Sequence, residues 1–170
     1  MHHLRTASAF AAMLSLALLN TPALAESHQT KLEGFQEVPA VVTGASGQFK
    51  MKIANDDSSF DFELSYDAIE GAGVTQSHIH VGQESVNGGI VIFLCTNLAP
   101  PAGVPTPPTC PSPGGIVTGT RTAADVLPQT TQGVSAHEFS AVLTAIRAGT
   151  AYANVHSTVS PGGEIRGQLK

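Results

Sequence analysis

Three histidines occupy positions from which their side chains could share one metal ion. His78 and His80 are two residues apart in a segment, 74–81, that reads as a β-strand, so both side chains leave the same face of that strand. His156 lies in a second predicted strand, 152–158. Imidazole clusters suit copper and zinc, and divalent copper stands highest in the affinity order. If the two strands lie close together, the sequence predicts a metal site at these three residues, with copper favoured over zinc.

The alternative is that these histidines are ordinary polar residues of an exposed strand face, since two histidines in H-x-H spacing are a weak motif. His137, near the start of a predicted helix, is a possible further ligand. A separate site arises if the chain is cleaved after Ala25, because Glu26-Ser27-His28 then becomes the N-terminus. Its amine, two backbone amides and the His28 imidazole form a square-planar nitrogen set, which selects Cu(II) or Ni(II).

No catalytic constellation accompanies these residues. The chain lacks the G-x-S-x-G, H-E-x-x-H and glycine-rich phosphate-loop motifs, so we assign no catalytic residue. Charged residues make up only 12% of the 170, and the formal net charge is −5 with no basic run. This composition argues against nucleic-acid binding, which needs clustered lysine and arginine.

Short strands are the elements that must position the histidines. Alternation of apolar and polar residues predicts a hairpin of strands 48–53 and 60–66, joined by the turn 55–58. Further strands are predicted at 74–81, 90–94, 116–120, 152–158 and 164–169. The pattern of about seven or more strands is typical of an all-β antiparallel fold, either a sandwich with Greek-key-like connections or a barrel-like fold.

One short helix interrupts the strands. Its apolar residues recur at helical spacing, its start carries a capping-box pattern, and a glycine follows its end. The residues concerned are Ser135 and Glu138 for the capping box, Phe139, Val142, Leu143 and Ile146 for the apolar face, and Gly149 for the C-cap.

The N-terminal segment and the cysteines both indicate export. Residues 1–25 have a mildly basic start, an apolar stretch and a small-residue ending, Ala23-Leu24-Ala25, as a cleavable signal peptide does. The apolar stretch is too short to span a bilayer, and we expect a secreted or periplasmic protein without a membrane span. Cys95 and Cys110 flank a proline-rich stretch, and in an oxidising compartment such a pair is most simply a disulfide.

Three strings of residues together resemble the CHRD domain, a module named for its occurrence in chordin and also found in secreted bacterial proteins. They are LEGFQEVPAV at 32–41, SHIHVGQESVNGGIVIFL at 77–94 and AGTAYANVHSTVSPGGEIRGQL at 148–169. With the predicted signal peptide at 1–25, the resemblance implies a single CHRD domain at 26–170, an extracellular β-sandwich with no established enzymatic activity. In the last string, Glu164 and Arg166 share a strand face and are interpreted as a surface ion pair.

The arrangement of histidines is also similar to the copper site of Cu,Zn superoxide dismutases, which implies a superoxide-dismutase-like sandwich with His78, His80 and His156 as copper ligands. No loop of the chain carries the further histidines and the aspartate that a bridging zinc site would need. We therefore expect a copper-binding protein rather than an enzyme. Two alternatives remain: an extracellular protein-interaction module without a metal, and a copper-dependent redox enzyme of the dismutase type.

Overall fold

The computed structural model describes residues 25–170, so the predicted signal peptide lies outside the described residues except for Ala25. The described part of the chain forms eight strands, one α-helix and three short 3-10 helices. The strands are β1 (Ser27–Glu33), β2 (Ser46–Ile53), β3 (Ser59–Asp67), β4 (Val74–Val81), β5 (Gly89–Thr96), β6 (Gly115–Thr122), β7 (Ala151–Ser157) and β8 (Ile165–Leu169). The α-helix is α1 (Phe139–Arg147), and the 3-10 helices are Gly34–Gln36, Ala123–Asp125 and Thr130–Gln132. No helix within residues 25–170 has the length and apolar character needed to cross a membrane.

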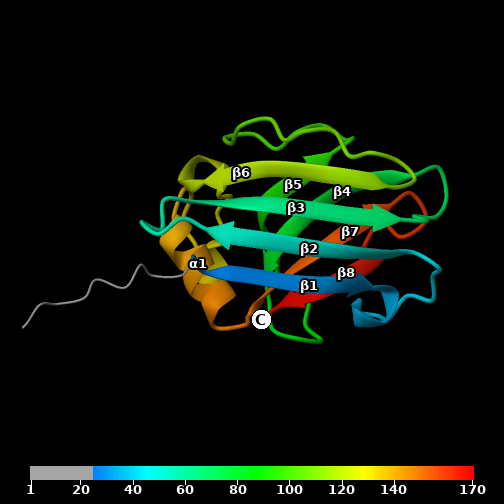
Figure 1. Ribbon diagram of the computed structural model, residues 1–170, viewed down its shortest axis with the longest axis horizontal. Helices are drawn as coiled ribbons and strands as arrows, with labels where there is room; N and C mark the ends of the chain where they lie inside the picture. The colour runs from blue at the N-terminus through cyan, green and yellow to red at the C-terminus, as the bar shows by residue number, and fades with distance from the viewer. Residues whose placement is uncertain (1–24) are drawn as a thin grey trace, which may run out of the picture.

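All eight strands belong to one antiparallel sheet with the order β5-β4-β7-β8-β1-β2-β3-β6. In Figure 1, β6, β3, β2 and β1 lie in front, and β5, β4, β7 and β8 lie behind them. The two layers join where β1 pairs with β8, at Glu33 and Arg166. The all-β antiparallel prediction is confirmed. In place of two separate sandwich sheets, however, the structure has one continuous sheet curled nearly into a barrel.

The predicted hairpin forms β2 and β3, with Phe49 opposite Leu64 and Met51 opposite Phe62. These side chains point into the apolar interior, while their charged neighbours in sequence face solvent, as the alternation requires. In the turn, the Asp56 carboxylate accepts hydrogen bonds from the backbone N–H and hydroxyl of Ser58. Strand β1 was not predicted, because Leu32 is its only buried side chain and no apolar alternation marks it.

Helix α1 covers one end of the curled sheet (Figure 1). Its buried residues are the four predicted ones, Phe139, Val142, Leu143 and Ile146. Gly149 takes a left-handed conformation with φ 68° and donates its N–H to the Ile146 carbonyl, as a C-cap glycine does. The predicted capping box is wrong: the helix begins at Phe139, and the Glu138 carboxylate accepts the Ser135 N–H before the helix starts.

Arg121 closes the gap between the two edge strands, β5 and β6. Its side chain extends from β6 and donates from Nε to the Phe93 carbonyl (2.9 Å) and from Nη2 to the Leu94 carbonyl (2.8 Å), both on β5. The guanidinium also lies 5.0 Å from the centre of the Phe62 ring. One buried guanidinium thus satisfies edge carbonyls that a strand ladder would otherwise satisfy.

The predicted disulfide between Cys95 and Cys110 is present, with 5.2 Å between the two Cα atoms. It closes the base of the proline-rich loop that follows β5. The Asn97 side chain fixes the same base: its amide nitrogen donates to the carbonyls of Val74 and Cys110, and its oxygen accepts the Cys110 N–H.

We expect Arg121→Met to lower the free energy of unfolding by about 2–4 kcal/mol, because the Phe93 and Leu94 carbonyls would remain buried without donors. Urea unfolding at neutral pH measures this difference. Lys50→Met is the matched control, since Lys50 forms an exposed ion pair with Glu63 and should contribute little. Equal stability of the two variants would mean that the guanidinium does not close the sheet.

Candidate metal centre

The histidines belong to a layer of polar side chains on the outer face of β4, β7 and β8. Along these strands the residues facing the apolar core, such as Ile79, Ala153 and Ile165, alternate with residues that point the other way. The outward-pointing residues form what we call the outer polar layer: His78, His80, Tyr152, Asn154, His156, Arg166 and Gln168. All seven are nevertheless buried, because loops cover this face of the sheet.

The structure brings the three predicted histidines together. Strands β4 and β7 are neighbours, with His78 opposite Asn154 and His80 opposite Tyr152. One ligand atom from each of His78, His80 and His156 lies within 4.8 Å of the others, and the side chains are 0%, 6% and 5% exposed. Nδ1 of His78 is 3.2 Å from Nε2 of His156. Three nitrogens bound to one metal at about 2.0 Å lie about 3.5 Å apart, so small shifts of the rings would complete the site.

Backbone carbonyls fix the orientation of two of the rings. Nδ1 of His80 is 2.9 Å from the Gly88 carbonyl oxygen, and Nδ1 of His156 is 2.9 Å from that of Pro161. A carbonyl only accepts, so each Nδ1 carries the proton and each neutral ring has its lone pair on Nε2. Hydrogen bonds of this kind orient metal-binding histidines and raise their basicity as ligands.

Burial keeps the imidazoles in the neutral, ligand-competent form. Loss of hydration lowers the pKa of His78 from 6.5 to about 2, with further lowering from His156 and His80. The same desolvation lowers the pKa of His80 to about 4, against hydrogen bonds to Gly88 and Asn154 that raise it. The pKa of His156 is lowered by burial as well. At neutral pH all three rings are therefore uncharged.

Two atoms at this site have unmet hydrogen-bonding needs. Among the described residues, Nε2 of His78 is buried without a partner, and its ring meets Phe93 edge-on at 4.3 Å between centroids. Nε2 of His80 faces Oδ1 of Asn154 at 3.1 Å. Because the proton of neutral His80 is on Nδ1, two lone pairs meet there. They are satisfied only when the amide rotates by 180° to present its N–H, or when a cation binds between them.

Tyr152 links the site to a buried arginine. Its ring stacks on His80 with 4.6 Å between centroids, and the Arg166 guanidinium lies 3.4 Å from the centre of the same ring. The Tyr152 hydroxyl oxygen accepts the Gly88 N–H at 3.2 Å, and the His80 ring bonds the carbonyl of the same glycine. No larger residue fits at Gly88, since a Cβ there would lie 1.6 Å from the Val81 carbonyl oxygen.

The predicted surface ion pair of Glu164 and Arg166 is wrong. Both side chains are buried, at 0% and 1% exposure. Arg166 donates to the carbonyls of Gln83 and Val86 in the loop that follows β4. Glu164 instead accepts from the Thr43 hydroxyl at 2.8 Å and from a backbone N–H at 3.1 Å. Each charge is buried because backbone or hydroxyl partners from distant parts of the chain replace water.

Glu37 is a further buried acid beside the polar layer. It is 5% exposed, and desolvation raises the pKa of its carboxyl from 4.5 to about 7, although Arg166 and Asn154 act to lower it. It packs against Gly163, where the backbone φ is 124° and a Cβ would lie 2.3 Å from Oε1 of Glu37. That Oε1 has no hydrogen-bond partner among residues 25–170.

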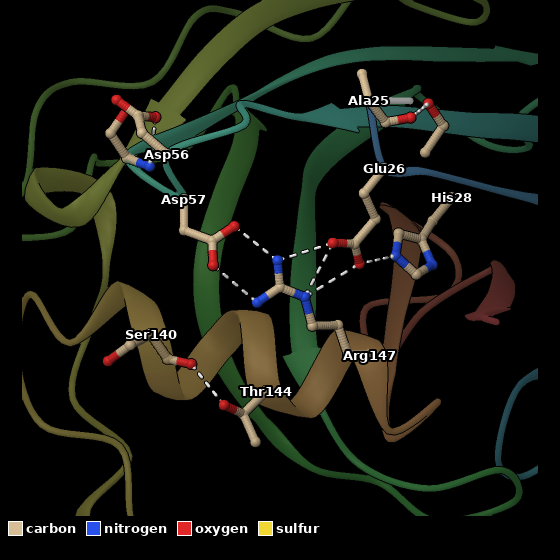
Figure 2. Close-up of polar contacts among 10 residues, drawn as sticks. Ala25, Glu26, His28, Asp56, Asp57, Ser140, Thr144 and Arg147 are labelled. Carbon is tan, nitrogen blue, oxygen red and sulfur yellow. Dashed lines mark hydrogen bonds and ion pairs between the residues drawn. The ribbon is translucent and has the colours of Figure 1, made fainter. Parts of the chain in front are cut away.

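The other predicted metal ligands lie elsewhere. His137 is exposed, with Nδ1 3.2 Å from the Ala123 carbonyl oxygen, and is not part of the group. At the start of the described chain, the Glu26 carboxylate meets both His28 and Arg147 (Figure 2). Ser27 and His28 already belong to β1, where they pair with β2. A chelate using their backbone nitrogens therefore requires this end of β1 to leave the sheet.

Sequence reasoning missed Tyr152, Asn154, Arg166 and Glu37 as parts of the site. The signal was present for the first two, because Tyr152 and Asn154 alternate with His156 and must share its strand face. Arg166 and Glu37 carried no such signal. Charged residues are mostly exposed, so nothing local indicated that loops would bury them.

Comparison with protein families now identifies the chain. The model of the CHRD domain matches residues 28–169, which include all three histidines of the site and both cysteines. The chain belongs to the CHRD domain family. The resemblance seen in the sequence is thereby confirmed. No curated protein and no solved structure matches this CHRD-domain chain.

We expect the metal-free CHRD domain to lose stability as the pH falls from about 6.5 to 4. Histidines in an unfolded chain have a pKa near 6.5, so over this range the unfolded state binds protons that folded His78 and His80 do not. Their contribution is full above pH 6.5 and is lost on acidification. Glu37 acts oppositely, because its raised pKa gives a contribution that is full below pH 4.5 and is lost as the pH rises through about 7.

Urea unfolding of chelator-treated protein at pH 7, 5.5 and 4.5 measures the effect. His78→Gln should take up about one proton fewer on unfolding. The slope of its unfolding free energy against pH should therefore be smaller by roughly 1.4 kcal/mol per pH unit between pH 4 and 6. His137→Gln is the exposed control and should keep the wild-type slope. The same slope in all three proteins would contradict the burial of a neutral His78.

Proposed function

We propose that this chain is an exported CHRD-domain protein that binds a metal ion, with copper favoured, through His78, His80 and His156. The observation that carries the proposal is the convergence of three buried, neutral imidazoles on one spot. The carbonyls of Gly88 and Pro161 direct Nε2 of His80 and of His156 towards that spot. Nδ1 of His78 and Nε2 of His156 are within hydrogen-bond distance of each other at 3.2 Å, and an ion would replace this contact and draw Nε2 of His80 into the same set.

The donor set favours copper over zinc. Both cysteines are held in the disulfide, and no carboxylate belongs to the group within the described residues, so the available ligands are imidazoles. Copper has the highest affinity among the divalent first-row ions for nitrogen ligands. Catalytic zinc with three protein ligands keeps a water in its open position, whereas these side chains are almost wholly covered. The likeness to the copper site of superoxide dismutases supports the same choice.

The proposed role is binding, carriage or sequestration. A copper-dependent redox enzyme, the other metal-based alternative, also needs a path for its substrate to the ion. The predicted Glu26-Ser27-His28 chelate stays a separate prediction that depends on cleavage after Ala25. It competes with the pairing of β1 to β2 and with the bonds of Glu26 to Arg147.

One observation favours an extracellular protein partner as a second function. Phe35 and Val42, in the connection between β1 and β2, are 71% and 85% exposed. Isolated exposed apolar residues are common on protein surfaces, but two on one short connection suit a protein contact. Such a contact would leave the histidines free to bind the ion.

Metal titration of tag-free exported protein tests the copper proposal. The protein carries one extra N-terminal residue, which moves His28 to the fourth position and removes the terminal chelate. We expect one equivalent of copper to bind, and the single variants His78→Gln, His80→Gln and His156→Gln to weaken binding at least ~10-fold each through loss of a ligand.

His137→Gln is the matched control and should bind copper as the wild type does, because this histidine lies outside the group. Circular dichroism of each variant confirms that the fold is kept. Unchanged copper affinity in all three ligand variants would overturn the proposal. Superoxide and oxidase assays of the loaded protein separate binding from turnover.

A further inference from the structure

The donor atoms around the candidate metal centre are all uncharged. They are nitrogens of three neutral imidazoles, and the group beside them, the Asn154 amide, is also uncharged, with its oxygen 3.1 Å from Nε2 of His80. The ionisable side chains that border this set are Glu37 and Arg166, which interact with each other electrostatically and are both buried. Arg166 is positively charged, and because burial raises the pKa of Glu37 to about 7, that carboxyl offsets this charge only in part at neutral pH. The site therefore offers an incoming cation no net negative charge.

We infer that the site selects the monovalent ion Cu(I) over divalent ions, and that Asn154 sets this choice by keeping the donor set uncharged. The inference rests on the proposed metal-binding function and names the ion that the site takes. It follows from the cost of moving an ion out of water, which rises with the square of its charge. An uncompensated divalent ion costs about four times as much to bury as a monovalent one.

Burial makes this cost decisive here. The three imidazoles are at most 6% exposed, so solvent cannot screen the charge of a bound ion or complete its coordination. Divalent ions of this series usually take four or more ligands, and zinc sites with three protein ligands keep a water. Monovalent copper is satisfied by three nitrogen donors in a plane. The buried three-histidine set meets the needs of Cu(I) without water or an anion.

The Asn154 side chain is held beside the His80 ring. Its backbone carbonyl accepts the Ser77 hydroxyl at 2.6 Å, and β7 pairs it with His78 on one side and Arg166 on the other. Its side-chain nitrogen packs closely against Gly163, where a Cβ would lie 2.9 Å from it. The side chain therefore has little freedom to leave the His80 ring. A carboxylate of the same shape at this position would place a negative charge beside the ion.

Competition titrations test the inference on the protein with the extra N-terminal residue. Cu(I) is titrated without oxygen against bathocuproine disulfonate, Cu(II) against nitrilotriacetate, and Zn²⁺ against a chromogenic chelator. We expect the wild type to bind Cu(I) at least ~100-fold more tightly than Cu(II) or Zn²⁺. Asn154→Asp should raise the affinities for Cu(II) and Zn²⁺ at least ~10-fold and leave that for Cu(I) unchanged or weaker.

The matched control is Asn55→Asp, the same chemical change in the exposed turn between β2 and β3, which should leave every affinity unchanged. If Asn154→Asp does not fold, Asn154→Ser removes the amide without adding charge and should preserve the preference for Cu(I). Loss of that preference in Asn154→Ser would count against the role of Asn154.

The outcomes separate this inference from the proposed function. Failure to bind copper in either oxidation state overturns the proposed function itself. Binding of copper with Cu(II) or Zn²⁺ held as tightly as Cu(I) overturns only the preference for the monovalent ion. An unchanged ratio of affinities in folded Asn154→Asp overturns the role of Asn154.

Discussion

The site depends on the contacts of one buried group, the guanidinium of Arg166. It joins the sheet to its covering loops, because it projects from β8 and donates to the carbonyls of Gln83 and Val86. It also lies against the ring of Tyr152, which stacks on His80. A planar cation with five donors can stack and hydrogen-bond at the same time, which lysine cannot do. Together with Tyr152, whose hydroxyl accepts the Gly88 N–H, the guanidinium fixes the loop whose Gly88 carbonyl orients His80.

The sheet thus separates two kinds of interior. Its inner face packs an apolar core with α1, and this packing supplies most of the fold's stability through burial of apolar surface. Its outer face at β4, β7 and β8 carries the polar layer, which the loop after β4 helps to cover. The pairing of β4 with β5 changes register between Ser77 and His78 and again between Ile79 and His80. The strand that carries two of the histidines is therefore irregular at this point. A rigid sheet that presents side chains to shaped loops is a common way to build a binding site.

The parts of this arrangement that the sequence could predict are those with local signals. Alternation located β2, β3 and β4, helical spacing located α1, and two-residue spacing placed His78 and His80 on one face. Strand β1 carries only Leu32 into the core, so its place follows from pairing with β2 rather than from its own residues. The closure by Arg121 and the burial of Arg166 depend on carbonyls more than twenty residues away in the sequence. No local pattern encodes such partners.

The separation of the apolar inner face from the polar outer face explains how the fold can carry polar atoms without hydrogen-bond partners. With the Asn154 amide oriented as it is, its Oδ1 and the lone pair of His80 face each other, and Nε2 of His78 has no partner within the described residues. Such local conflict costs stability, and natural sequences avoid it except where function requires it. Here the cost falls on the loop-covered outer face, while the apolar core on the other side of the sheet is complete without an ion. The barrel therefore holds the three imidazoles in place without an ion, and under the proposed function a cation bound beside His80 and Asn154 would relieve the conflict.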